Sequence, residues 1–265
     1  MKTAVALLCL AALVYCGILA AAKLFANALM FHPPARTYVK TRELSFFEMP
    51  DGTKLAALML KSGKPDAPKI FYCHGNGEDL GLVRPGLEEL RKRGFDVFSY
   101  DYCGYGFSEG RPTEKNLYES AEAAWNYVAA KFGYAPENTV LFGFSLGSAA
   151  VCAVAEKRDG WRGIILAGGI ANGAKTTLPI DIIPWKILDN SSKVAEFKCP
   201  LLILHGTRDA IVAPRNAREN FDAAKCPKKL VWLKGYGHNN ISSSPEYAAE
   251  VENFIKNPKL CKKLL

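Results

Sequence analysis

The sequence contains no CxxC pair and no histidine-rich cluster, the two patterns that most often indicate a zinc or redox site. Of its eight cysteines, Cys9 and Cys16 lie in an apolar stretch near the N-terminus. The other six are consistent either with disulfides in an exported domain or with buried thiols. These six are Cys73, Cys103, Cys152, Cys199, Cys226 and Cys261. We therefore expect no metal ion in this protein.

The sequence also has no internal repeat, no low-complexity tract and no nucleic-acid-binding motif. Its 265 residues are 49% hydrophobic, which excludes disordered, collagen-like and small disulfide-scaffold proteins. The net charge of +8 comes from 34 basic and 26 acidic side chains that are intermixed, as on an ordinary solvated surface. Nucleic acid is therefore not an expected partner. The basic tail of Lys256, Lys259, Lys262 and Lys263 is suited to anionic lipid headgroups.

The N-terminal segment carries almost no charge. Residues 4–22 are 19 positions without a charged side chain, which at ~1.5 Å per residue can cross a ~30 Å hydrocarbon core as a helix. A buried helix of a soluble domain would carry a polar face, which this segment lacks. Ala20 and Ala22 form a small-x-small pattern that a signal peptidase can cut, so secretion after cleavage stays open. We favour residues 1–35 as a retained single-pass signal anchor with a linker, and residues 36–265 as a domain on the exported side of the membrane.

Short strand-like runs alternate with helical patterns through that domain. A hairpin is expected where residues 43–49 and 54–60 flank a Pro-Asp-Gly sequence. The later runs are mostly continuous apolar segments, as in a sheet that is covered on both faces. They are residues 69–73, 96–100, 139–142, 163–166, 201–204 and 230–233.

Apolar residues recur at helical spacing in the segments between these runs. The pattern over residues 117–132 ends at Gly133, a second covers residues 146–154, and a third covers residues 247–255 behind Ser244 as the expected N-cap. The alternation predicts an α/β fold with a mostly parallel, doubly wound sheet of about eight strands. In such folds the functional loops lie at the C-terminal ends of the strands.

One of these loops has the pattern of a serine nucleophile. Gly143-Phe144-Ser145-Leu146-Gly147 matches GxSxG directly after one apolar run and directly before an alanine-rich helical pattern. A sharp turn from strand to helix projects the serine hydroxyl from the sheet, and the helix N-terminus favours negative charge nearby. We predict that Ser145 is a nucleophile.

A serine hydroxyl needs a base, usually histidine, and an acid that orients the base. Of the four histidines, His32 lies near the apolar segment, and His74 and His205 each precede a glycine at a strand end, where a structural role is expected. His238 lies in the late loop Gly-Tyr-Gly-His. We predict that His238 is the base. Asp209, which follows the apolar run of residues 201–204 and so is expected at the same edge of the sheet, is predicted to be the orienting acid.

Tetrahedral chemistry also needs N–H donors for the oxyanion. The N–H of Leu146 at the start of the helix is one candidate. The second is expected from the turn His74-Gly75-Asn76-Gly77, in which Asn76 is best placed. A third glycine-rich loop, residues 101–110, is expected to support the site structurally.

The order Ser145, Asp209, His238 on alternating strands and helices resembles the α/β-hydrolase superfamily. Five motifs are similar to those of bud-emergence-like, membrane-anchored hydrolases related to protein depalmitoylases, whose N-terminal anchor also matches. They are HGNG at His74, DYxGYGxSxG at Asp101, GFSLGS at Gly143, LILHGTRDAIV at Leu202 and GYGHN at Gly235. The resemblance implies an α/β-hydrolase fold with a short lid over about residues 170–197.

The lid segment includes many apolar residues, which favours a substrate with an acyl or aromatic group. We therefore expect a serine hydrolase that cleaves carboxylic esters or thioesters of acyl, lipid-like small-molecule substrates through an acyl-enzyme, without an organic cofactor. A serine aminopeptidase-like peptide hydrolase is an alternative that needs an acidic pocket for the substrate amine. A catalytically silent binding protein of the same fold is another alternative, although the presence of all three triad residue types argues against it.

Overall fold

The computed structural model describes residues 2–173 and 184–258, and their α/β domain is built on one sheet of eight strands. The strand order is β1-β2-β4-β3-β5-β6-β7-β8. The strands are β1 Leu44–Glu48, β2 Lys54–Leu60, β3 Lys69–Cys73, β4 Asp96–Tyr100, β5 Thr139–Phe144, β6 Gly163–Ala167, β7 Leu201–Gly206 and β8 Lys228–Leu233. β2 is antiparallel to β1 and to β4, and all other neighbours are parallel. The predicted fold class is confirmed.

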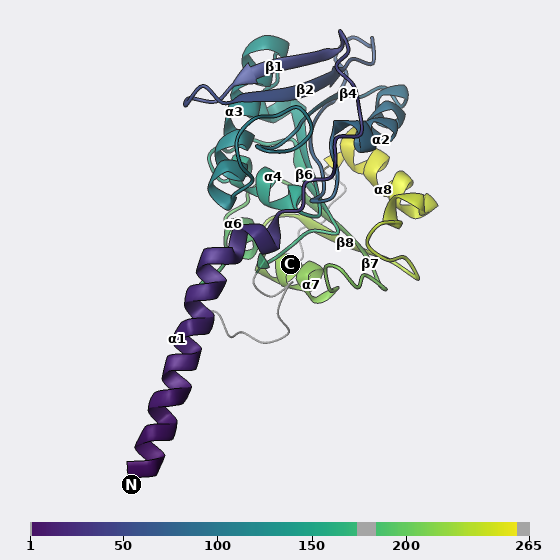
Figure 1. The fold of residues 1–265 in the computed structure, drawn as a ribbon. Coiled ribbons are helices and arrows are strands. Elements are labelled where there is room, and N and C mark those ends of the chain that lie inside the picture. Colours follow the sequence, from purple (N-terminus) through teal and green to yellow (C-terminus); the bar gives the residue numbers. More distant parts are fainter. Residues whose placement is uncertain (1, 174–183, 259–265) are drawn as a thin grey trace.

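Helices cover both faces of this sheet (Figure 1). The helices of the described residues are α1 Lys2–Met30, which does not cover the sheet, α2 Leu80–Lys92, α3 Glu114–Phe132, α4 Gly147–Ala155, α6 Asn190–Val194, α7 Arg215–Ala223 and α8 Pro245–Lys256, with short 3-10 helices at Pro136–Asn138 and Ile241–Ser243. α2 and α8 share one apolar layer, whereas α3, α4 and α7 share the other. Alternate strand residues point to opposite faces, so Phe71 enters one layer and Ile70 the other.

Local signals explain where several helices begin and end. The Thr113 hydroxyl accepts a hydrogen bond from the Asn116 N–H at 3.0 Å and so caps α3, which ends at Gly133 with φ +65°. Ser244 occupies the N-cap position of α8 as expected, but its side chain makes no capping hydrogen bond. α2 is a helix that the sequence analysis did not identify. It starts after Asp79, whose carboxylate accepts from the N–H groups of its first turn.

The cysteines of the described domain are buried free thiols, which settles an open alternative for five of the six. Burial raises the pKa of the Cys103 thiol to about 11 and that of Cys199 to about 12. The five are Cys73, Cys103, Cys152, Cys199 and Cys226. Cys261 lies outside the described residues.

α1 projects away from the domain (Figure 1), and none of its residues is buried. It is long and apolar enough to cross a bilayer, a property that a membrane anchor shares with a signal sequence. The chain that follows α1 is not a free linker, since Phe31 is only 6% exposed and packs into the core. Residues 174–183 of the expected lid and the last three lysines of the basic tail lie outside the described residues, whereas α6 belongs to the described part of that lid segment.

Candidate active site

The turn between β5 and α4 places Ser145 in a strained conformation. Its φ is +51°, in the left-handed region that costs a residue with a side chain about 1–2 kcal/mol. The flanking glycines are required by space: a Cβ on Gly147 would overlap the Cys73 carbonyl, and a Cβ on Gly143 would lie 2.6 Å from the Ser148 Cα. The GxSxG pattern therefore reflects close packing of this turn against β3 and the start of α4.

The structure brings Ser145, Asp209 and His238 together from three loops at the C-terminal ends of β5, β7 and β8. His238 Nε2 lies 2.8 Å from Ser145 Oγ, and His238 Nδ1 lies 2.7 Å from Asp209 Oδ2. The three residues are 7%, 4% and 6% exposed, respectively. The Phe144 ring packs on the imidazole of His238, with 5.2 Å between ring centroids. This chain of contacts can carry a proton from the hydroxyl to the imidazole.

Asp209 is held by groups on its own loop as well as by His238. Its Oδ1 accepts hydrogen bonds from the Ile211 N–H at 2.9 Å and the Val212 N–H at 2.8 Å. Burial by itself raises the pKa of Asp209, but hydrogen bonds from His205, His238 and Val212 outweigh it and hold the pKa well below the usual carboxyl range. Asp209 is therefore ionised at neutral pH.

His205 is a contact of Asp209 that the sequence analysis missed. Its Nε2 lies 2.8 Å from the Val212 carbonyl oxygen and 3.2 Å from Asp209 Oδ2. One ring nitrogen of His205 therefore contacts both ends of the segment from Asp209 to Val212. The sequence signal that could have indicated this contact is the position of His205 at the end of an apolar run, four residues before Asp209. His205 keeps a structural position, as expected, but it contacts the acid directly.

Asn76 and Leu146 each carry a backbone N–H that has no hydrogen-bond partner among the described residues. Leu146 immediately precedes α4, where unpaired N–H groups and the helix dipole favour negative charge. The side chain of Asn76 is held by contacts with other segments. Its Nδ2 donates to the Met30 carbonyl at 2.7 Å, and its Oδ1 accepts from the His32 N–H at 2.9 Å and the Tyr105 hydroxyl at 2.6 Å. The backbone N–H of Asn76 takes part in none of these contacts.

The third glycine-rich loop lies behind this turn. The Tyr102 hydroxyl donates to the His74 carbonyl at 2.6 Å, next to the Asn76 contact from Tyr105. Asp101 Oδ1 accepts from the Leu80 N–H at 2.8 Å and thereby ties the loop to α2. The loop thus contacts the turn of residues 74–77 through hydroxyl groups that are buried in the domain. Because this turn is predicted to supply an N–H for the oxyanion, we call it the oxyanion turn.

A cavity of about 490 Å³ opens over Ser145 and His238. Its lining includes three residues that the sequence analysis did not place at the site, namely His32, Glu78 and Ile211. Ile211 is 56% exposed, which gives the cavity an apolar rim. Within residues 2–173 and 184–258, no group of three or more histidine, cysteine, aspartate or glutamate side chains is arranged to hold a metal ion.

Known proteins match this chain in sequence and in fold. The family model described as Hydrolase_4, serine aminopeptidase S33, matches residues 64–191. Human α/β hydrolase domain-containing protein 17B is 30% identical over 212 residues, which cover 77% of this chain and 72% of the human protein. Protein 17C of the same name from Xenopus tropicalis is 31% identical over 216 residues, covering 78% and 67%.

Two solved esterase structures resemble the domain. An esterase from Pyrococcus furiosus superposes with a TM-score of 0.71 at 18% identity, covering 86% of this chain and 98% of the esterase. The esterase domain of a Rhodothermus marinus protein superposes with a TM-score of 0.60 at 27% identity, covering 80% and 95%. The first likeness concerns the fold alone because its sequence identity is low.

Proposed function

Because this chain belongs to the α/β-hydrolase superfamily, we propose that it is a serine hydrolase of acyl esters or thioesters in which Ser145, His238 and Asp209 form the catalytic triad. The observation that carries the proposal is the pair of contacts through His238, at 2.8 Å to the hydroxyl and 2.7 Å to the carboxylate. Both distances lie within the reach that a nucleophile, a base and its orienting acid require.

The mechanism follows from these contacts. His238 Nδ1 donates to Asp209, which leaves Nε2 as the acceptor for the Ser145 proton. Ser145 Oγ attacks the substrate carbonyl, and the N–H groups of Asn76 and Leu146 stabilise the oxyanion. His238 then protonates the leaving group, and an acyl-enzyme remains on Ser145. His238 next activates a water molecule, whose attack releases the acid and restores the serine. Asp209 stays ionised and stabilises the imidazolium.

The test is hydrolysis of a short-chain p-nitrophenyl ester by the wild-type chain and by Ser145→Ala. Loss of the nucleophile should lower kcat by about a thousandfold or more. A fluorophosphonate probe should label the wild-type chain and fail to label Ser145→Ala. Hydrolysis at the parental rate by the variant would rule out Ser145 as the nucleophile, and an inactive wild-type chain that the probe does not label would favour a binding protein of this fold.

A second candidate function is the hydrolysis of a peptide-like amide that carries a free amine. The observation in its favour is Glu78, the one acidic residue among the described residues that line the cavity over Ser145. Glu78 Oε2 already accepts the Gly75 N–H at 2.6 Å, which commits part of the carboxylate to the oxyanion turn. We therefore rank ester and thioester hydrolysis first, and aminoacyl p-nitroanilides assayed in parallel distinguish the two.

We also propose that α1 is a retained single-pass anchor that keeps the domain of residues 36–265 on the exported side of a membrane. The support is the apolar surface of α1, in which no residue is buried by the domain. Its last turn is bonded to the domain beside the cavity through Met30. This arrangement places the cavity close to the membrane surface and suits small acylated substrates that partition into it.

A further inference from the structure

The helical layer over one face of the sheet has a gap. β3 is a central strand, paired on both sides by β4 and β5, yet Tyr72, the fourth of its five residues, is partly exposed. Central strands of a doubly covered sheet normally have both faces buried. α2 and α8 flank the gap on this face (Figure 1), and its floor is formed by the rings of Tyr72 and Phe142, whose centroids are 5.1 Å apart.

The gap is a groove of about 510 Å³. α2 contributes Val83, Gly86 and Leu90 to one wall, and α8 contributes Ala248 and Val251 to the other. An ion pair between Arg93 and Glu252 joins the two helices at the far end. The stretch of α2 that borders the groove, from Leu82 to Arg93, spans roughly 16 Å at the helical rise. A groove of that length holds roughly a dozen methylene groups at ~1.2 Å per chain bond.

The groove adjoins the cavity over Ser145. The same four residues, Tyr72, Glu78, Ser242 and Tyr247, line both spaces. Tyr72 comes from β3, Glu78 from the segment between β3 and α2, Ser242 from the 3-10 helix Ile241–Ser243, and Tyr247 from the first turn of α8. The two spaces therefore meet along a border of side chains and not of backbone strands, and a linear acyl group on Ser145 has to pass between these side chains to enter the groove.

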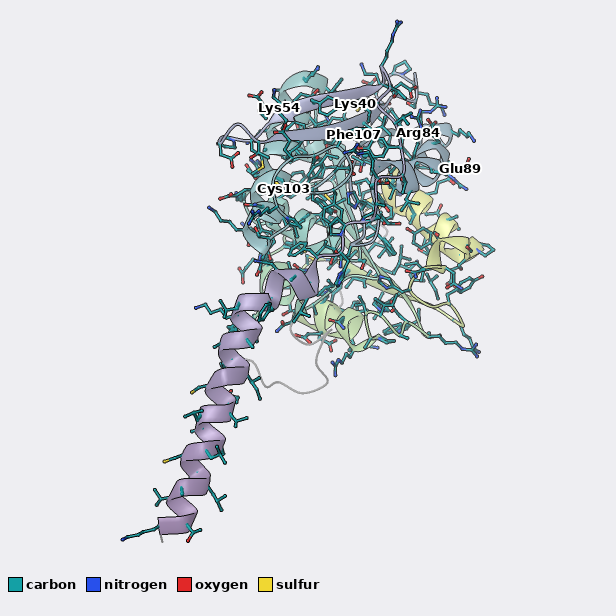
Figure 2. The ribbon with its side chains drawn as sticks, in the orientation of Figure 1. Lys40, Lys54, Arg84, Glu89, Cys103 and Phe107 are labelled. Carbon is teal, nitrogen blue, oxygen red and sulfur yellow. The ribbon has the colours of Figure 1, made fainter. Side chains whose placement is uncertain are left out.

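The charged side chains of the groove are already paired. Glu78 accepts the Gly75 N–H, Glu89 pairs with Lys92 at 2.7 Å, and Glu252 pairs with Arg93. Glu89 lies on α2 (Figure 2), and its side chain is largely exposed. Because each of these charges has a partner, the groove offers an apolar surface to a ligand rather than an unpaired charge.

We propose that this groove is the binding site for the acyl chain of the substrate, and that it selects unbranched chains of medium to long length. The proposal rests on the proposed function, since it concerns the acyl group that Ser145 would accept. A methylene that is fully buried is worth about fourfold in binding. Because the groove is open to solvent along one side, we expect about half of that free energy, which corresponds to about twofold per methylene.

Gly86 allows a sharp test because it borders the groove and a Cβ at this position meets no atom within 4 Å. Gly86→Phe should fill the groove without disturbing the domain, and Gly86→Ala is the matched control that leaves it open. The assay is kcat/KM for p-nitrophenyl esters from acetyl to dodecanoyl, each below its critical micelle concentration. For the wild-type chain and Gly86→Ala, kcat/KM should rise about twofold per methylene. Gly86→Phe should lose about tenfold or more on the dodecanoyl ester and stay within about twofold on the acetyl ester.

Ala248→Trp fills the groove from the opposite wall and should give the same pattern. The thermal midpoint of each variant and its fluorophosphonate labelling show that the fold and Ser145 are intact. Unchanged chain-length profiles in both variants, or equal losses on all esters with labelling retained, would overturn the groove as the acyl site while ester hydrolysis stands. Loss of ester hydrolysis in the wild-type chain would instead overturn the proposed function.

Discussion

At Asp209, burial and hydrogen bonding act on one carboxyl group in opposite directions. Burial raises its pKa, and two imidazoles with a backbone amide lower it by more. The folded state therefore binds a proton at Asp209 less readily than the unfolded chain, whose aspartate has a pKa of about 3.9. The stabilisation from this residue is complete above that pKa and is lost as the pH falls below it toward the lower folded-state pKa.

The free energy of unfolding should show this dependence on acid. We expect the stability advantage of the wild-type chain over Asp209→Asn to shrink between about pH 5 and pH 3, because protonation of Asp209 in the unfolded chain removes the difference. Urea unfolding at a series of pH values measures it. Glu137→Gln, a change on the partly exposed 3-10 helix before β5, is the control for general acid effects. An advantage that is constant across this pH range would contradict the expectation.

At the scale of elements, the end of α1 and the oxyanion turn are one assembly. The Asn76 side chain binds the carbonyl of Met30, the last residue of α1, and the N–H of His32 just beyond it. A helix C-terminus leaves carbonyl groups unpaired, so a side chain from another element is a favourable partner there. The consequence is that the position of the Asn76 backbone N–H depends on how α1 is seated.

Replacing Asn76 with alanine removes the side-chain contacts with Met30 and His32 but keeps the backbone N–H. The variant therefore tests whether these contacts position that N–H. Asn76→Ala should lower kcat on a short ester by about tenfold or more, since a displaced oxyanion donor loses much of its contribution. KM should change little because ground-state binding does not use this side chain. Asn253→Ala, on an exposed position of α8, is the matched control. An unchanged kcat for Asn76→Ala would show that the contact only attaches α1.

α2 shows why elements are missed from the sequence. It contains Pro85 and two glycines, which by propensity disfavour a helix. The Asp79 cap and the apolar contacts of Leu80, Val83 and Leu87 with the sheet outweigh that propensity. Gly86 has no side chain, so it leaves space on the α2 side of the groove. The glycines of α2 therefore both weaken the helical pattern in the sequence and widen the groove.

At the scale of the whole molecule, an apolar helix projects from a domain, and the cavity over Ser145 lies beside the last residues of that helix. Leu10 and Leu13 are 60% and 72% exposed, so the domain does not bury these two side chains. Exposed apolar surface of this extent is unfavourable in water and favourable in lipid. Insertion of α1 would bring the cavity, bordered by His32 and Ile211, to the membrane surface.

Charges in the centre of α1 test this arrangement. Each lysine at the centre of a spanning helix costs about 2.5–3.5 kcal/mol of insertion free energy. The Leu10→Lys, Leu13→Lys double variant should therefore be released from membranes by alkaline carbonate, whereas the wild-type chain should stay in the membrane pellet. Hydrolysis of a soluble short ester in detergent should be the same for both. Release of the wild-type chain by the same wash would contradict the anchor.

The sequence by itself determined the elements whose signals are local. Apolar runs and helical periodicity gave all eight strands and α3, α4 and α8 to within a few residues, because these patterns arise from which faces of an element are buried. The motif around Ser145 followed from the same kind of local constraint, since only glycine fits on both sides of so tight a turn. The choice of His238 and Asp209 followed from their places after late strands.

The tertiary structure alone decided the contacts between residues that are distant in the chain. Asn76 meets Met30 and His32 across more than forty positions. His205 contacts Asp209 because their loop folds back onto the strand end. The groove exists because α2 and α8, separated by most of the domain, stand apart over Tyr72. Such features depend on the spacing between packed elements, and that spacing is set by the sum of all side chains between them.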